Sequence, residues 1–459
     1  MKDIDKLQQV INSGLCNRCG TCVGLSNGNI RFRDKTGIYL PEIITEPPAE
    51  LANKMWHACS GKGFNFPEYR QHIFPKDNNF HVYLGSYKNI YIGHCSDEKI
   101  RRQSASGGII SAILIWLLEK GRIDGAVVLG MSDKEPWLTQ PLIARSRSEI
   151  MAAAQSKYTI SSVNEILPEI AGFQGQLAFV GLPGQIQSIR TLQTMKEPAV
   201  KNIRYLFGPF YGNTLHFSSI RSFLRSHGEK DYNKIKKLYF RYGEWPGYMR
   251  IEMCTGSVIE LPKFHANYLI PFHILKNSLL CTDLSNEFTD ISGGDAWAPI
   301  YEERGKGFSM VIARSKTGQL ILDEMVKTGF LSLQPITEHE AITMHSHGYD
   351  LKKRGAFIRM QFRKFLGRDV PDYGYELGGF SVSRYLMEAA IVFLFTISST
   401  SLARFIVELI PPRWMGRLFE KARHFWKKST YQVKRNDLVS TTPQNNPQYG
   451  PQHDTDETH

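Results

Sequence analysis

The sequence predicts an α/β protein, with some α+β character, in which a small cysteine-bearing segment precedes a layered core and a basic helical region follows it. Runs typical of buried strands alternate with apolar or amphipathic helices between residues 85 and 335, which is the pattern of a layered α/β domain. Four of the seven cysteines lie within the first 75 residues. With 42% hydrophobic and 22% charged residues among 459, the composition excludes disordered and collagen-like chains.

The pattern divides the chain into five parts. They are a cysteine-bearing segment, two successive portions of a layered α/β core, a basic helical region and a polar tail, at residues 1–80, 85–168, 169–335, 343–435 and 436–459. The tail has too little apolar surface to pack, so we expect it to be disordered.

Local patterns predict the elements of the core in order. NIYIGHC and DGAVVLG flank the apolar stretch GIISAILIWLLEKG, which predicts a strand–helix–strand unit. QLAFVGLP, NIRYLFGPF and GFSMVIARS are typical of buried strands, QIQSIRTLQTM of a helix, and DISGGDAWAP of a glycine-rich loop. Short strands and turns between residues 234 and 274 predict antiparallel pairing.

Cys16, Cys19 and Cys22 form the strongest local signal. Their C-x2-C-x2-C spacing is that of ferredoxin-type [4Fe–4S] sites, in which a fourth cysteine follows closely. A serine stands near that place here, and the next thiol along the chain is Cys59. We predict one [4Fe–4S] cluster on these four cysteines, and a zinc site that uses His57 or Cys59 is the alternative.

A serine- and glycine-rich turn, RRQSASGG, joins the first strand to the long helix. Glycines let the backbone approach a ligand, and free N–H groups at a helix start attract phosphate. The turn offers an anion Arg101, Ser104, Ser106, Gly107 and Gly108. A serine that only caps the helix is the alternative, and the spacing is not the G-x-G-x-x-G fingerprint.

Two further turns follow helices or strands in the same manner. AAAQSKY offers a hydroxyl, a cation and an aromatic ring on Ser156, Lys157 and Tyr158. GLPGQ, which contains Gly181, Pro183 and Gln185, ends a strand and opens a helix, where α/β proteins usually bind ligands. Taken alone, each turn is more typical of a purely structural turn than of a ligand site. Together with the cysteine motif, the turns indicate a bound dinucleotide.

The C-terminal region carries basic, aromatic-bearing helices around one apolar run. KKRGAFIRMQFRKFLGR and RWMGRLFEKARHFWKK predict surface helices suited to anionic lipid, with a solvated basic helix as the alternative. The run between them, AAIVFLFTISSTSLA, is shorter than the ~20 residues that a bilayer requires. We therefore predict a buried or interfacial helix rather than a membrane span.

The net charge of the chain and its N-terminal sequence predict its partners and its location. The 56 Lys and Arg exceed the 44 Asp and Glu by a net charge of +12, which favours an anionic partner. Nucleic acid is not expected, because no recognition motif accompanies the basic helices. The opening MKDIDKLQQVINSG has no apolar core of signal-peptide length, which predicts a cytoplasmic protein that is at most peripheral to the inner face of the membrane.

Five motifs, in this order, resemble the beta-subunit family of coenzyme F420 hydrogenase and dehydrogenase, which includes 7-hydroxymethyl chlorophyll a reductase. They are the cysteine triplet, SASGGIISAIL, AAAQSKY, FVGLPGQIQSIR and NSLLCTDLSNEFTDISGGDAWAP. RYGEWPGYMRI and GGDAW look closer to a bacterial subgroup found among polysaccharide-biosynthesis genes. The resemblance implies an iron–sulfur flavoprotein that holds FAD at Ser104, Ser106, Gly107, Gly108, Ser156, Lys157, Tyr158, Gly181, Pro183 and Gln185, with Arg101 and Lys157 balancing flavin or phosphate charge.

The chain departs from the family where further cysteines are usual. Gly184, Tyr211 and Ser278 stand at three such positions, and Cys281 keeps one thiol. Glycine and tyrosine cannot replace thiolates, so we predict no second cluster. The thiols outside the predicted cluster are then ordinary buried cysteines, namely Cys95, Cys254 and Cys281.

The resemblance implies an oxidoreductase that passes electrons from a ferredoxin-like carrier, through [4Fe–4S] and FAD, to a small organic acceptor. Polysaccharide biosynthesis is the setting that the bacterial subgroup suggests. Tyr158 and Asp295 are the catalytic candidates. Two alternatives stay open: a non-catalytic binding or assembly component of an envelope-polysaccharide system, and a transferase that uses a sugar nucleotide.

Overall fold

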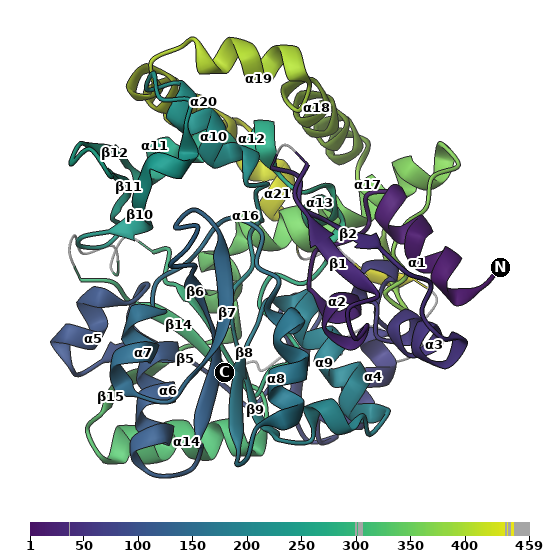
Figure 1. The fold of residues 1–459 in the computed structure, drawn as a ribbon, viewed down its shortest axis with the longest axis vertical. Helices are drawn as coiled ribbons and strands as arrows, with labels where there is room; N and C mark the ends of the chain where they lie inside the picture. Colours follow the sequence, from purple (N-terminus) through teal and green to yellow (C-terminus); the bar gives the residue numbers. More distant parts are fainter. Residues whose placement is uncertain (36, 299–300, 302–305, 437, 439–441, 445–459) are drawn as a thin grey trace, which may run out of the picture.

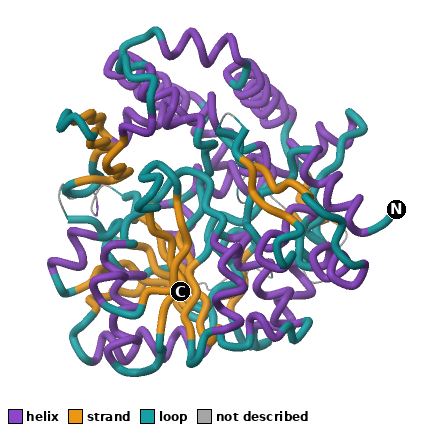
Figure 2. The backbone as a smooth tube through the Cα atoms, viewed as in Figure 1, coloured by secondary structure: helices purple, strands orange, loops and turns teal. Residues whose placement is uncertain are grey.

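The computed structural model describes the chain except residues 36, 299–300, 302–305, 437, 439–441 and 445–459. Its centre is one eight-stranded mixed sheet in the order β15-β5-β14-β13-β9-β8-β6-β7, which Figure 2 shows as the orange strands. In that order the strands are Leu331–Pro335, Asn89–Cys95, Ser309–Ala313, Ile291–Asp295, Ile203–Pro209, Leu177–Val180, Gly125–Met131 and Thr139–Ala144. The predicted α/β fold is confirmed. The glycine-rich loop predicted for DISGGDAWAP is wrong in its first half, because ISGGD forms β13 between β9 and β14.

Five strands of the sheet share one direction. β6, β8, β9 and β13 pair in parallel, and β14 is antiparallel to both β13 and β5, so β5 follows the same direction. The carboxyl ends of these five strands therefore meet at one edge of the sheet. This is the edge at which α/β proteins bind ligands.

Helices cover both faces of the sheet because the strand residues alternate between two apolar cores. On β14, Val311 and Ala313 pack with one face and Met310 and Ile312 with the other. The first face carries the buried residues of α6 (Ile109–Glu119), α7 (Arg147–Ala152) and α14 (Lys316–Lys327). The second carries α8 (Leu167–Gly172), α9 (Pro183–Thr194) and the N-terminal segment. The predicted strand–helix–strand unit is present as β5, α6 and β6, although other strands lie between β5 and β6.

The N-terminal segment shares one apolar core with α8 and α9, to which it contributes Leu7, Val10 and Met55. Figure 1 shows it in purple beside these helices. Its elements are α1 (Asp3–Asn12), α2 (Thr21–Leu25), β1 (Ile30–Arg33), β2 (Leu40–Ile43), α3 (Ala49–His57), η1 (Ser60–Lys62), α4 (Phe66–Ile73), β3 (Asn79–His81) and β4 (Gly85–Tyr87). α5 (Glu98–Gln103), η2 (Val163–Ile166) and η3 (Pro198–Val200) are short helices between the strands of the core.

A separate three-stranded sheet, β10-β11-β12, is antiparallel as predicted. Its strands are Ile235–Tyr242, Tyr248–Met253 and Val258–Pro262, and the helices around it are α10 (Ser218–Arg225), η4 (Tyr232–Lys234), α11 (Lys263–Ala266), η5 (Asn267–Leu269), α12 (Ile270–His273) and α13 (Lys276–Leu280). Cys254 lies in the turn after β11 and is exposed. The prediction that Cys254 is a buried thiol is therefore wrong, whereas Cys95 and Cys281 are buried as predicted.

The C-terminal region is helical as predicted. It comprises α15 (Glu338–Met344), α16 (Ser346–Tyr349), a π-helical turn η7 (Asp350–Arg354), α17 (Gly355–Phe365), β16 (Glu376–Gly378), α18 (Val382–Ser398), α19 (Ser401–Glu408), α20 (Pro412–Ser429), α21 (Tyr431–Asn436) and β17 (Thr442–Gln444). Three strand residues of the predicted disordered tail pair with β16 instead, and most of that tail lies outside the described residues.

Two predictions for this region are wrong in part. The stretch 352–368 is not a lipid-facing surface helix at its start, because Lys352, Lys353 and Arg354 are buried. Of the buried or interfacial helix predicted for the apolar run, the buried form is wrong, since the chain breaks between α18 and α19 and much of its apolar surface is exposed; the interfacial form stays a prediction. No single described helix is long and apolar enough to cross a membrane, but α18 and α19, bent by 73°, pass that test of length and composition together.

Candidate functional site

The predicted ligand residues lie in three places near the sheet edge. Residues 101–108 belong to the end of α5 and the turn after it, and this turn lies against the start of β14, because the Gly107 N–H donates to Ser309 Oγ over 2.9 Å. Residues 181–185 run from the end of β8 into α9, beside Asn17 of the cysteine loop. Residues 156–158 lie near Lys263 and Arg241.

The four predicted cluster cysteines lie close enough to affect one another. Burial raises the pKa of Cys16, and raises that of Cys22 further, with the other thiols of the set adding to the effect. Burial and the neighbouring Cys19 and Cys16 raise the pKa of Cys59 to about 12. Cys59, distant in sequence, therefore joins the triplet in space.

The four thiols are soft donors of the kind that a cubane [4Fe–4S] cluster takes, one on each iron, and a zinc ion also accepts cysteine ligands. Among the described residues, no group of three or more His, Cys, Asp or Glu side chains is already arranged to hold a metal ion. Burial is the main cause of the raised pKa values, and bound iron would stabilise the thiolates in this buried place, so the donor set fits [4Fe–4S].

Cys19 receives its own polar support. Its backbone N–H donates to Asn17 Oδ1 over 3.0 Å, and its sulfur lies 3.2 Å from Thr21 Oγ1 and 3.9 Å from Ser188 Oγ. Hydroxyl groups at this position can donate to a thiolate or a cluster sulfur. Gly20 has φ +92° and a Cβ there would lie 2.6 Å from the backbone of Glu165, so this turn of the cysteine loop requires glycine.

The residues 181–185 are tied to their surroundings and to the cysteine loop by hydrogen bonds and close packing. Gln185 is buried, its Oε1 accepts from the Leu182 N–H over 2.6 Å, and its Nε2 donates to Ser161. A Cβ at Gly184 would lie 2.2 Å from Asn17 Nδ2. Gly181, Pro183 and Gln185 therefore hold the cysteine loop against the sheet edge.

The positions where the family has further cysteines meet around one small pocket beside Cys19. Gly184, Tyr211 and Cys281 line it, and Tyr211 Oη lies 2.6 Å from Ser278 Oγ. Lys352 donates from Nζ to the Ser278 carbonyl over 2.7 Å. Tyr211, Ser278 and Lys352 thus form a hydrogen-bonded group around the positions where the family usually has cysteines.

The loop at 101–108 retains one unsatisfied polar group. Ser104 Oγ is buried without a hydrogen-bond partner among the described residues, whereas Ser106 Oγ donates to the Phe308 carbonyl. Arg101 donates from Nε to the Gly307 carbonyl over 3.1 Å. Gly108, with φ +76°, is the N-cap of α6, so the alternative in which a serine caps this helix is wrong. A ligand that accepts from Ser104 at this helix start would satisfy the group.

Lys157 and Tyr158 face different surroundings. The Lys157 ammonium donates to the carbonyls of Ala154 and Gln155, over 2.8 and 3.3 Å, and also to that of Ala153. Burial lowers its pKa to about 7. Lys157 therefore closes its own loop, while the half-buried Ser156 has no such role.

Tyr158 and Asp295, the two catalytic candidates, meet at Arg241. Arg241 donates from Nη2 and Nη1 to the Asp295 carboxylate over 3.0 and 3.2 Å, and, against the effect of burial, Tyr158 lies near enough to raise the pKa of Arg241. Lys263 Nζ lies 4.5 Å from the Tyr158 ring centre. Although burial opposes it, Arg241 lowers the pKa of Asp295, so this carboxylate stays ionised.

Sequence reasoning missed Arg241, Trp245 and Lys263. Trp245 Nε1 donates to Asp295 Oδ1 over 2.7 Å, and its ring lies 5.5 Å from that of Trp297. Arg241 and Trp245 belong to RYGEWPGYMRI, which carried part of the family resemblance but received no chemical role. An arginine and a tryptophan placed among turns are the feature of the sequence that could have indicated this site.

One short segment joins the Arg241 cluster to the cysteine loop. It begins at Tyr158 in the Arg241 cluster and reaches Asn164, whose N–H donates to the Cys19 carbonyl over 2.9 Å. Asn164 Nδ2 also donates to Thr21 Oγ1 over 2.9 Å. Five residues lie between Tyr158 and Asn164, so the Cα atoms of these two residues are at most about 20 Å apart. The cysteine loop and the Tyr158 cluster are therefore neighbouring parts of one candidate redox site.

Curated relatives share much of this chain. It is 25% identical over 366 residues to the coenzyme F420-dependent sulfite reductase of Methanocaldococcus jannaschii, covering 76% of this chain and 52% of the relative. It is 28% identical over 263 residues to the coenzyme F420 hydrogenase subunit beta of Methanosarcina barkeri, covering 56% of this chain and 84% of the relative. The chain thus spans about half the length of the sulfite reductase.

A solved structure shares the fold. A chain of the F420-reducing [NiFe] hydrogenase complex from Methanosarcina barkeri matches with a TM-score of 0.50 at 24% identity, covering 64% of this chain and 98% of the other. Family models match twice: the beta subunit N-terminal model of coenzyme F420 hydrogenase/dehydrogenase at residues 90–168, and the C-terminal model at residues 175–339. The chain therefore belongs to the coenzyme F420 hydrogenase/dehydrogenase beta-subunit family.

Proposed function

We propose that the chain is an iron–sulfur flavoprotein oxidoreductase that accepts electrons at its N-terminal cysteine site and delivers them to a small organic acceptor. One observation carries the proposal: four mutually interacting thiols lie one short segment away from the buried Tyr158–Arg241–Asp295 cluster. The names of the relatives, a hydrogenase subunit and a reductase, support the redox class.

FAD, bound at the loop after β5, would supply the exchange between one-electron and two-electron carriers. The residues of the chain have simpler roles. Ser104 offers a buried hydroxyl to the cofactor, and Asp295 holds Arg241 in a fixed orientation. Arg241 in turn lies near the Tyr158 side chain, whose hydroxyl is a candidate proton donor to the acceptor. Trp245 and Trp297 cover this cluster with aromatic surface.

The first test is an anaerobic purification with a visible spectrum, iron and sulfide assays and release of bound flavin. We expect about four iron atoms per chain and one FAD. FAD without iron would contradict the role of the cysteines. Neither cofactor after reconstitution would overturn the proposal and favour a binding or assembly component, and tight binding of a nucleotide sugar without flavin would favour a transferase.

The second test identifies the electron carriers. Reduced ferredoxin and reduced coenzyme F420 are each mixed anaerobically with the holoprotein, and bleaching of the flavin band is followed. The ferredoxin-like donor predicts bleaching by ferredoxin. Coenzyme F420 is the second candidate, because it occurs in the names of several relatives, and bleaching by it alone would replace ferredoxin in the proposal.

A further inference from the structure

The helices α18, α19 and α20 share an exposed apolar surface at one end of the molecule, at the top of Figure 1. Exposure of its large side chains runs from 48% for Ile397 to 73% for Phe425. We call it the C-terminal apolar surface, and its main residues are Leu386, Phe393, Leu394, Ile397, Leu402, Phe405, Ile406, Leu409, Trp414, Leu418 and Phe425. Scattered single hydrophobic residues are normal on a surface, but eleven large ones along three successive helices indicate an interaction site.

The polarity of α18 is inverted relative to a helix on a water-soluble protein. Its charged residues Arg384 and Glu388 are 0% exposed, whereas Leu386, Phe393 and Leu394 on the opposite side are more than half exposed. A helix at a water interface places its apolar stripe inward. α18 presents that stripe outward, so its outer face is suited to an apolar medium.

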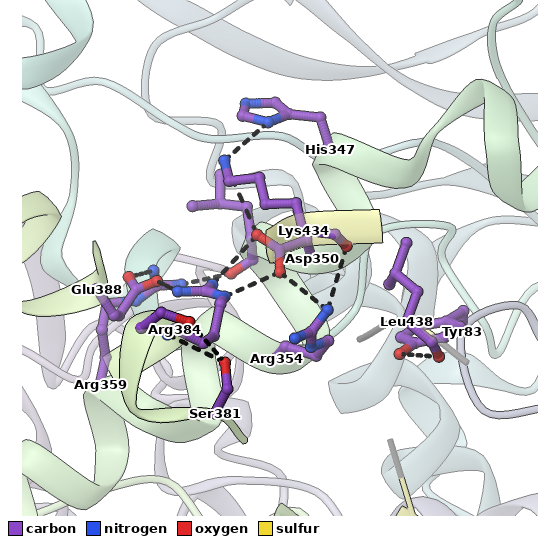
Figure 3. A network of polar contacts seen from close by, with 12 residues as sticks. Tyr83, His347, Asp350, Arg354, Arg359, Ser381, Arg384, Glu388, Lys434 and Leu438 are labelled. Atoms are coloured by element: carbon purple, nitrogen blue, oxygen red, sulfur yellow. Dashed lines mark hydrogen bonds and ion pairs between the residues drawn. The ribbon is translucent and has the colours of Figure 1, made fainter. Parts of the chain in front are cut away.

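Buried ion pairs fix α18 in this orientation, as Figure 3 shows. Arg384 Nε lies 3.0 Å from Asp350 Oδ1 and its Nη1 lies 2.6 Å from Glu388 Oε2. Arg359 of α17 pairs with the same Glu388 carboxylate. Turning the apolar side of α18 inward would break the Arg384–Asp350 and Glu388–Arg359 pairs to neighbouring elements, so its exposure is a stable property of the fold.

Three hydroxyl groups where α18 meets α19 donate to carbonyls of the chain itself. Thr396 Oγ1 donates to the Val392 carbonyl over 2.7 Å, Ser399 Oγ to Thr396 O over 2.9 Å, and Thr400 Oγ1 to Ile397 O over 2.8 Å. In lipid, polar groups must find partners within the protein, and these three protons have them. A protein interface of ordinary size uses several direct hydrogen bonds across it, and these three hydroxyls have no proton left to donate to one.

α20 adds the charge that a membrane surface selects. Trp414, Leu418 and Phe425 lie on one side at helical spacing. The exposed charged residues of α20 are all basic, namely Arg413, Arg417, Lys421 and Lys428. A helix with Trp, Leu and Phe between basic residues is typical of one that lies in the headgroup region of an anionic bilayer.

We propose that the chain docks on an anionic lipid bilayer through the C-terminal apolar surface. The bent pair of α18 and α19 enters the boundary between headgroups and acyl chains as a wedge. The basic residues of α20 contact lipid phosphates beside it. The bend of 73° between α18 and α19, and the ion pair of Arg384 with Asp350, keep these two helices at the membrane surface. This inference is independent of the proposed redox function.

The test is flotation of the full chain with lipid vesicles on a density gradient. One set contains phosphatidylcholine with one quarter phosphatidylglycerol, and the other contains phosphatidylcholine alone. We expect the chain to float with the anionic vesicles and more weakly with the neutral ones. Phe393→Glu combined with Phe405→Glu places charges on the apolar surface and should lower partitioning more than about tenfold.

The matched control is Leu320→Glu combined with Val326→Glu on α14, where these side chains are 51% and 41% exposed. It adds the same charge away from α18 and should float like the parent. Urea unfolding of each variant confirms that it is folded. Absence of flotation with anionic vesicles, or an equal loss in both double variants, would overturn the proposal. So would a vesicle-free dimer that only the Phe393→Glu, Phe405→Glu variant dissociates, since the surface would then belong to a second copy.

Discussion

Arg241 and Asp295 form a two-pronged ion pair between the small antiparallel sheet and the end of β13, with N–O distances of 3.0 and 3.2 Å. The Arg241 side chain is 4% exposed, so the pair is largely withdrawn from water. Trp245 donates to the same carboxylate. One aspartate thus connects the sheet edge to two side chains of the neighbouring unit.

Removing Asp295 should therefore be costly. Asp295→Ala leaves Arg241 buried without its carboxylate, and we expect a loss of about 3–5 kcal/mol in the free energy of unfolding. Urea unfolding measures it. The control Asp323→Ala removes an exposed carboxylate of α14 and should change stability by no more than about 0.5 kcal/mol. A loss below about 1 kcal/mol for Asp295→Ala would contradict the importance of the pair.

Iron content should depend on the four clustered thiols. Cys22→Ser and Cys59→Ser each remove a soft ligand, and we expect iron per chain to fall by more than about half after anaerobic purification. Cys254→Ser is the control, because that thiol is exposed in a turn. Full iron retention in Cys59→Ser would exclude it as the fourth ligand. Loss of bound metal in His57→Ala, with zinc in the parent, would favour the zinc alternative.

Flavin content should depend on Ser104. Ser104→Asp places a negative charge at the buried hydroxyl without a described partner, and repulsion of the cofactor phosphates should release most of the flavin. The ratio of flavin absorbance to protein measures this effect. Ser257→Asp adds the same charge at an exposed turn and should leave flavin content unchanged. Equal flavin in both variants would move the cofactor away from this loop.

Gly184 and Asn17 should be coupled. The Cβ of Gly184→Ala would lie 2.2 Å from Asn17 Nδ2, and displacing that amide disturbs its bond to Ser60 Oγ. We expect a loss of about 1–3 kcal/mol and reduced iron retention. Combining the change with Asn17→Ala removes the clash, so a double-mutant cycle should give a coupling above about 0.5 kcal/mol. Strict additivity would show that the two loops are independent.

Glu165 should make stability depend on pH. Burial raises its pKa to about 7, so between about pH 4.5 and 7 the folded chain holds a proton that the unfolded chain releases. The contribution of Glu165 to the free energy of unfolding therefore falls as pH rises through this range. Glu165→Gln should reduce the fall measured by urea unfolding at pH 5.5 and 7.5. Glu169→Gln, at an exposed site, should retain it, and an unchanged slope in Glu165→Gln would refute the assignment.

Most strands and helices of the core could be predicted because their side-chain periods are local properties. NIYIGHC, GIISAILIWLLEKG and QLAFVGLP occupy β5, α6 and β8 as expected. ISGGD was mistaken for a loop, since two glycines weaken the strand pattern. Its strand character comes from pairing with β9 and β14 on both sides, which no local pattern contains.

In the basic C-terminal region, too, local sequence could not show the outcome of packing. Lys353 and Arg384 look like surface residues in the sequence, yet they pair with Glu287 and Asp350 inside the protein. A buried charge is stable only when its partner is in place, and these partners lie 66 and 34 positions away. Composition therefore could not distinguish inward from outward cations.

The sequence by itself determined the alternation of strands and helices, the cysteine spacing and the family, because these depend on residues near one another along the chain. Only the tertiary structure decided that Cys59 joins the triplet, that Tyr158 and Asp295 meet at Arg241, and that α18 turns its apolar side outward. Each of these results depends on contacts between distant segments. Packing against a common sheet edge, or pairing of buried charges, selects such contacts from among the many that the same local pattern allows.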